Sequence, residues 1–198
     1  MTTEVHRGFP AETILREWLA DDDINLFCGR WDEGSIMELL PAGNAVLTDP
    51  KYDGPFAGLR DLRIAGSAHH IHLDFGKLDR VQYRIAPSVC FGFRPSFEIR
   101  FHRDQRDPAT AYGLGLAVAT PYAHRQLNLP TIERYVERMQ RHRTRFPDTV
   151  SFHWQRRNED DPSTLSTLRR LIAPTEIEPP VPVDRSTNGA ALASDAPR

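Results

Sequence analysis

The strictest alternation of apolar and polar residues along the chain runs from residue 96 to residue 102. Alternate side chains of a strand point to opposite faces, so this segment predicts a strand with one apolar and one polar face. The apolar face holds Phe97, Ile99 and Phe101, and the polar face holds Glu98, Arg100 and His102. We expect the apolar face to pack on a core and the polar face to meet solvent or to face a site.

Shorter apolar or alternating runs predict further strands. The central set comprises residues 68–75, 80–85, 96–102 and 113–120, and a short strand follows at 150–154. Upstream, the segments 35–40 and 44–48 flank Pro41-Ala42-Gly43, a sequence typical of a turn, and together predict a hairpin. Residues 49–59, with prolines and glycines at intervals, predict a loop.

Apolar residues at helical spacing predict helices at 10–20, 130–146 and 163–172, the last with Ser163 as its N-cap. The longest of them also carries a basic stripe of four residues, Arg134, Arg138, Arg141 and Arg145. We expect this stripe to be a solvated face, paired with neighbours such as Glu133 and Glu137.

These elements predict an α+β fold in which a large antiparallel β-sheet is flanked by helices. A single domain is expected over residues 1–173, a length that suits one hydrophobic core. Residues 174–198 begin with several prolines and end in a polar, alanine-rich run. That composition predicts a disordered C-terminal tail.

Composition narrows the classes of function. The formal net charge is −2, so no nucleic-acid partner is expected unless a local basic patch provides one. No apolar run approaches the length of a membrane span and residues 1–23 do not resemble a signal peptide, so we expect a cytoplasmic protein without a membrane partner. Cys28 and Cys90 lie in apolar runs and are expected to be small buried residues. Motifs for nucleotide phosphates, dinucleotides and a serine nucleophile are missing.

Three of the 8 histidines fall within four residues, at His69, His70 and His72. Strand alternation places His70 and His72 on one face with Asp74, and His69 on the other. Residues two apart on a strand have Cα atoms about 7 Å apart. Both imidazoles would therefore reach one metal ion, or one would bind a haem iron while the other hydrogen-bonds a propionate or ligand. Asp74 would orient an imidazole.

Other residues are candidates for the same site. His102, His124 and His153 are the remaining candidates for a third ligand, although a structural role is favoured for His153. His6 and His142 are expected to be solvated.

The segment 86–95 is an apolar loop with one cation, and it includes Phe91 and Arg94. Apolar walls with an arginine suit a flat, apolar ligand that carries carboxylates, such as haem. The alternative is a loop that packs on the core.

The motif around the histidines is similar to that of a known family. The segments Gly66-Ser67-Ala68-His69-His70-Ile71-His72-Leu73-Asp74, Lys77-Leu78-Asp79-Arg80-Val81 and Ser96-Phe97-Glu98-Ile99-Arg100-Phe101 resemble bacterial haem-utilisation proteins of the ChuX/HutX and haemin-degrading-factor type. The resemblance covers residues 60–122. It implies a large antiparallel sheet, haem bound against that sheet, a cytosolic role in haem handling and a possible homodimer. Residues 102–108 depart from the family's usual turn-and-glycine sequence.

Three functions are therefore kept open. The first is a haem-binding protein, a carrier or a haem-dependent enzyme, with His70, His72, Phe91, Arg94 and His102 as the residues that bind the cofactor. The second is a non-haem metalloenzyme that holds a divalent metal ion through His70 and His72. The third is a non-enzymatic interaction module that recruits a partner through the arginine stripe or the tail.

Overall fold

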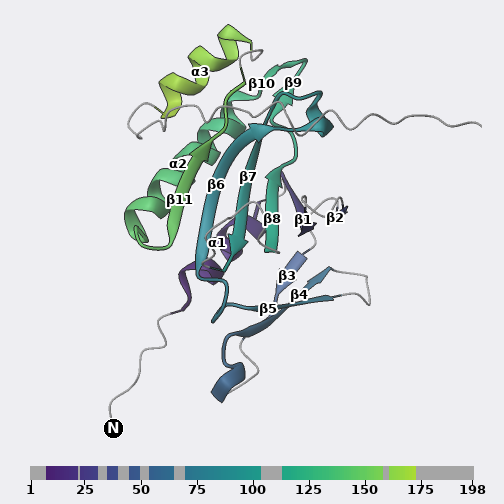
Figure 1. Ribbon diagram of the computed structural model, residues 1–198, viewed down its shortest axis with the longest axis vertical. Helices are drawn as coiled ribbons and strands as arrows, with labels where there is room; N and C mark the ends of the chain where they lie inside the picture. The colour runs from purple at the N-terminus through teal and green to yellow at the C-terminus, as the bar shows by residue number, and fades with distance from the viewer. Residues whose placement is uncertain are drawn as a thin grey trace, which may run out of the picture.

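A six-stranded sheet, a three-stranded sheet and three α-helices form the main part of the protein in a computed structural model (Figure 1). The predicted α+β class is confirmed. The structure describes residues 8–21, 23–30, 35–39, 45–49, 54–64, 70–103, 113–157 and 161–172. The predicted tail at 174–198, His6 and His69 lie outside the described residues. Within the described ranges, no helix is both long and apolar enough to cross a membrane.

The larger sheet has the strand order β11 (Val150–Trp154), β6 (Arg80–Pro87), β7 (Pro95–His102), β8 (Gly113–Val118), β1 (Ile24–Arg30) and β2 (Ser35–Leu39). Neighbouring strands are antiparallel, except that β11 runs parallel to β6 after the chain has crossed over through α2 (Leu129–Arg145). The central strands were predicted, whereas β1 was not.

One face of the larger sheet packs against helix α2. Cross-strand pairs place Tyr83 opposite Ile99 and Ile85 opposite Phe97, and all four are fully buried. The ring of Tyr135 from α2 lies 5.5 Å from the ring of Phe97. The predicted apolar face of residues 96–102 is therefore confirmed. Its polar face is not wet, because Glu98 and His102 are buried as well.

The smaller sheet has the order β3 (Ala45–Leu47), β4 (Leu59–Ile64) and β5 (His70–Asp74), with antiparallel pairing. The predicted hairpin of 35–40 with 44–48 is wrong, because β2 pairs with β1 in the larger sheet while β3 pairs with β4. Strand β4 was not predicted. The histidine strand therefore belongs to a separate sheet from the other central strands.

The three predicted helices are confirmed as α1 (Pro10–Leu19), α2 and α3 (Pro162–Ile172). The N-cap of α3 is Asp161 rather than Ser163, since the Asp161 carboxylate accepts the backbone N–H of Thr164 at 2.9 Å and the hydroxyl of Ser163. Proline then occupies the first helical position, where it is well tolerated. Helix α3 packs against α2 (Figure 1).

The basic stripe of α2 pairs with α1 and the residues after it, and not with Glu133 and Glu137 as expected. Arg134 and Arg138 each lie 3.1 Å from the Asp21 carboxylate. Arg141 lies 2.8 Å and Arg145 3.6 Å from the Glu17 carboxylate. The stripe therefore joins α2 to α1 and to the residues after it, although Arg134, Arg141 and Arg145 remain substantially exposed.

Helix α1 is fastened to the smaller sheet by a buried ion pair. Arg60 on β4 and Glu12 on α1 are 5% and 7% exposed. Two parallel bonds of 3.0 Å and 2.9 Å join the guanidinium to the two carboxylate oxygens. The remaining Arg60 nitrogen donates to the carbonyls of Ala57 and Leu59, so all three nitrogens of the buried guanidinium are hydrogen-bonded.

A buried chain of hydrogen bonds joins α1, α2 and β6. His142 was expected to be solvated, yet its side chain is 0% exposed, with Nε2 2.8 Å from the Glu17 carboxylate and Nδ1 2.5 Å from the Tyr83 hydroxyl. Because a neutral imidazole has one donor and one acceptor, Nε2–H donates to Glu17 and Nδ1 accepts from Tyr83. The indole N–H of Trp18 donates to the Tyr83 oxygen at 2.8 Å.

Candidate metal site

His70 and His72 project from the outer face of β5, the last strand of the smaller sheet in the described structure. The alternation predicted for this strand is confirmed, because Leu73 is buried in the core while both histidines are exposed. In the register of β4 and β5, Asp61 lies opposite His72 and Arg63 opposite His70. Side chains directly opposite one another share a face, so these four residues form one cluster.

The two imidazoles converge on a single point. Their Nε2 atoms are 3.2 Å apart, and their rings lie nearly perpendicular at 88° with centroids 4.7 Å apart. Metal–nitrogen bonds of about 2.0–2.1 Å would turn this 3.2 Å separation into an N–metal–N angle of about 100–106°, close to tetrahedral. Ligand atoms of Asp61, His70 and His72 all lie within 4.8 Å of one another.

Asp61 fixes the orientation of one imidazole. Its Oδ1 atom lies 2.9 Å from Nδ1 of His72, and its Oδ2 atom accepts from Arg63 at 3.1 Å. The hydrogen bond from Arg63 lowers the pKa of the Asp61 carboxyl more than burial raises it, and His72 lowers it further. An ionised Asp61 accepts the Nδ1–H of His72 and so leaves the Nε2 lone pair of His72 directed at the metal position.

Sequence reasoning assigned this orienting role to Asp74, and the structure corrects it. Asp74 accepts the backbone N–H of Gly76 at 3.0 Å and pairs with Lys77 at 3.0 Å, so it stabilises the turn after β5. Asp61 was missed because its proximity to His72 depends on the pairing of β4 with β5. The alternation of Leu62 and Ile64 with Asp61 and Arg63 is a short signal for a strand there, and the charged Arg60 interrupts it.

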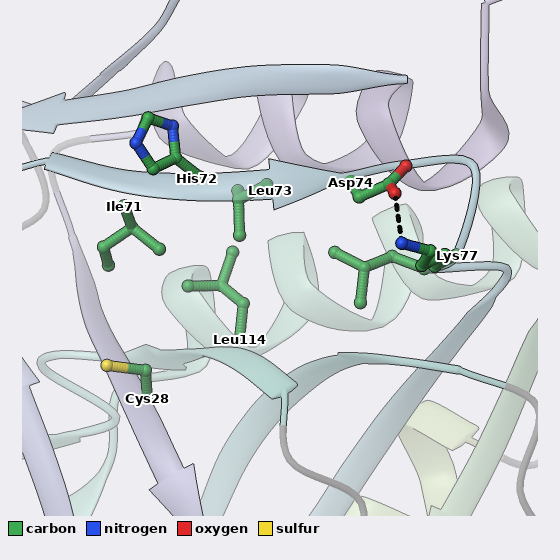
Figure 2. Close-up of a pocket in the computed structure, with 8 residues that line it drawn as sticks. Cys28, Ile71, His72, Leu73, Asp74, Lys77 and Leu114 are labelled. Carbon is green, nitrogen blue, oxygen red and sulfur yellow. Dashed lines mark ion pairs between the residues drawn. The ribbon is translucent and has the colours of Figure 1, made fainter. Parts of the chain in front are cut away.

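An open cleft lies on the other side of β5, between the two sheets (Figure 2). Ile71 and Leu73 point from β5 toward Leu114 and Cys28, while His72 projects from the opposite side of the strand. The volume of about 170 Å³ suits a small apolar group and is below the roughly 300–1,000 Å³ of pockets for drug-sized ligands. Burial raises the pKa of the Cys28 thiol, which therefore stays protonated at neutral pH.

The other residues proposed for haem do not join this cluster. Phe91 and Arg94 lie between β6 and β7, where both contact Tyr122. The turn from β6 to β7 lies at the end of the larger sheet that is far from β5 (Figure 1). His102 is buried at the end of β7, with Nδ1 2.9 Å from the carbonyl of Arg103. The remaining candidates for a third ligand also lie elsewhere, since His124 is exposed in a hairpin turn and His153 lies on β11.

The expectation that both cysteines are buried is also wrong. Cys90 is exposed in a single 3₁₀ turn (Val89–Phe91), and Cys28 is half-buried on β1, where it lines the cleft. Cys28 and Cys90 do not form a disulfide with each other.

Comparison with known proteins does not assign the chain to a family: no protein-family model matches it, and no curated protein matches it significantly. The similarity to haem-utilisation proteins therefore stays a prediction from the motifs at residues 66–81 and 96–101. The site itself places two imidazoles where both could bind one metal ion, with further coordination positions left for water or another ligand.

Proposed function

We propose that the protein binds a metal centre through His70 and His72, with Asp61 as the residue that orients His72. The observation that carries this proposal is the 3.2 Å separation of the two Nε2 atoms, which fits two ligands of one metal. In the absence of metal, one Nε2–H donates to the other Nε2. Metal binding replaces that hydrogen bond once His70 has moved its proton to Nδ1.

The geometry favours a single divalent ion over haem. A haem iron bound to His72 would place the porphyrin where the His70 ring lies, only 4.7 Å away, so that ring would have to turn aside. Phe91 and Arg94, which were expected to line a haem pocket, lie at the other end of the larger sheet. Haem iron also binds to imidazole nitrogen, however, so an experiment has to distinguish a divalent ion from haem.

Replacing either His70 or His72 with alanine is expected to weaken binding of Zn²⁺ or Co²⁺ at least tenfold, because each change removes one of two protein ligands. Calorimetric titration of the untagged protein with Zn²⁺ measures the affinity, and the visible absorption of bound Co²⁺ reports the coordination. A parallel titration with hemin follows the Soret band.

The matched control is His124→Ala, which removes an exposed histidine far from the site. Binding of one ion per chain that both site variants lose and the control keeps supports the proposal. A Soret change that depends on His72, without binding of Zn²⁺ or Co²⁺, would identify haem as the form of the metal. The proposal fails if neither titration shows binding, or if the double variant His70→Ala, His72→Ala binds as tightly as the wild type.

Replacing Asp61 with alanine is expected to lower metal affinity about 10- to 100-fold, since the partner that holds the tautomer of a metal-binding histidine contributes that much. Asp61→Asn should lose less, because the amide oxygen still accepts the Nδ1–H of His72. Asp74→Asn is the control on the same strand. Equal affinities for Asp61→Ala and the wild type would show that Asp61 plays no part in the site.

The cytoplasmic location, the homodimer and a catalytic use of the metal stay predictions beside this proposal. A metal with open coordination positions can activate water or polarise a bound carbonyl. Such activity would be tested only after the ion has been identified.

A further inference from the structure

A surface at the far end of the larger sheet carries an unusual concentration of arginine and aromatic side chains. It comprises Phe91, Phe93, Arg94, Tyr122, Arg125 and Arg156, which we call the arginine–aromatic patch. The residues come from the turn between β6 and β7, from the hairpin of β9 (Tyr122–Ala123) with β10 (Gln126–Leu127), and from the segment after β11. These three segments meet at one end of the sheet (Figure 1).

Specific contacts hold the patch together. The Arg94 guanidinium lies 4.1 Å from the centre of the Tyr122 ring, and the centre of the Phe91 ring lies 5.8 Å from the same point. Arg94 also donates to the carbonyl of Arg125 at 3.3 Å, which joins the two turns. On the β11 side, the Arg157 guanidinium lies 5.1 Å from the centre of the Phe93 ring, and the neighbouring Arg156 guanidinium lies 5.7 Å from the centre of the buried Trp154 ring.

The backbone of the patch is strained. Phe93, His124 and Arg125 have φ values of 63°, 49° and 68°, and they are the only non-glycine residues in the described structure with a left-handed backbone. Phe93 is also 56% exposed, although an aromatic ring gains nothing from water. Strained residues of this kind persist where the surrounding structure enforces them, and they are concentrated at functional sites.

Among the described residues, the structure pairs no carboxylate with the arginines of the patch. The segments 85–97, 113–131 and 149–157, from which it is built, contain no aspartate or glutamate. Arg94, Arg125 and Arg156 make no ion pair with a carboxylate of the described residues, and Nε of Arg156 is a buried donor without a partner there. The patch is therefore a local basic surface on a chain with a net charge of −2.

We propose that the arginine–aromatic patch binds single-stranded nucleic acid, with a base stacked on the part of the Phe93 ring that Arg157 leaves exposed and phosphates held by Arg125 and Arg156. Exposed aromatic faces and a basic track are the two components of sequence-tolerant strand binding. An extended strand fits better than one nucleotide, because the arginines and aromatics are spread over three segments. From the net charge, a nucleic-acid partner was expected only if the chain had a local basic patch. The arginine–aromatic patch is a surface of that kind.

The proposal is tested by the fluorescence anisotropy of a labelled ten-nucleotide deoxythymidine strand. Phe93→Ala removes a ring that is mostly exposed, so the fold should be unchanged while affinity falls about fivefold or more through lost stacking. Arg125→Glu should weaken binding further and flatten the salt dependence. For the two phosphates held by Arg125 and Arg156, the slope of log affinity against log salt is about −1.4 in the wild type.

Two controls make the result decisive. Arg169→Glu applies the same charge reversal to an exposed position on α3 and should leave affinity unchanged, as should His70→Ala at the metal site. An equal loss in Arg169→Glu, or equal binding of a duplex of the same length, would show non-specific attraction and overturn the proposal. If a mononucleotide at the same concentration of bases displaced the labelled strand completely, the patch would bind a small nucleotide, and the proposal of strand binding would be overturned. An anisotropy that does not change on titration would exclude both.

Discussion

Glu12→Ala is expected to lower the free energy of unfolding by about 3–5 kcal/mol, as is typical when one partner of a buried ion pair is removed. The variant leaves the Arg60 guanidinium, 5% exposed, without the carboxylate that accepts two of its bonds. The two carbonyls that Arg60 also binds do not neutralise its charge. Urea denaturation, followed by the fluorescence of the tryptophans, measures the change.

Two further variants separate the charge from the packing. Glu12→Leu combined with Arg60→Met removes both charges and should recover most of the loss, since apolar replacements of a buried pair are often neutral or stabilising. Arg16→Ala removes the more exposed partner of the same carboxylate, together with its bonds to the carbonyls of Leu47 and Thr48, and should cost about 1–2 kcal/mol, less than Glu12→Ala. A loss of less than about 1 kcal/mol in Glu12→Ala would mean that water reaches Arg60.

His142→Phe is expected to cost about 2–3 kcal/mol near pH 8, because it leaves the buried Tyr83 hydroxyl without its acceptor while it fills the space of the imidazole. Burial lowers the pKa of His142 below 6.5, although Glu17 opposes the shift and Arg141 and Arg138 add to it. The folded state therefore binds fewer protons than the unfolded chain in the window just below pH 6.5.

The sign of the pH dependence follows from that difference. Where the unfolded chain binds more protons, stability rises with pH, so the wild type should lose stability as the pH falls from about 7 through the window of His142. Partial burial alone would raise the pKa of Glu17, but hydrogen bonds from His142 and Arg141 bring it below 4.5, which adds a second loss in more acidic solution. Denaturation of both proteins at a series of pH values measures the effect.

His142→Phe should not show the loss of stability that the titration of His142 causes in the wild type below about pH 7. Its deficit against the wild type therefore shrinks as the pH falls from 8 to 5. A deficit that stays constant over this range would show that His142 does not titrate differently in the folded and unfolded states. Tyr83→Phe is a useful comparison, because it breaks the same chain of bonds and keeps the imidazole.

Local periodicity was enough to predict several features of the chain. The alternation in β7 identified its core residues, and the alternation in β5 placed His70 and His72 on one face. The apolar stripe of α2 identified the residues that it buries. In each case the signal lies within a few residues of the position that it predicts, so no knowledge of the rest of the fold is needed.

The errors concern pairings between residues distant in the sequence. Asp61 reaches His72 only through the register of β4 with β5, and Asp74 looked equivalent in sequence because it shares the face of the histidines. His142 stands in a basic run typical of a solvated surface, yet it is buried. Its hydrogen-bond partner Glu17 lies 125 positions away in the sequence. Long-range pairing of this kind leaves no periodic trace in the chain.

Helix α1 makes a separate connection to each half of the molecule. Its Glu12 binds Arg60 on β4 of the smaller sheet. Its Glu17 binds His142 on α2, and its Trp18 binds Tyr83 on β6 of the larger sheet. Ten residues thus link the free energies of two sheets that share no strand. Since neither sheet keeps these contacts once the helix detaches, both should unfold in one cooperative transition, and the smaller sheet with its histidines would gain its resistance to local opening from the larger one.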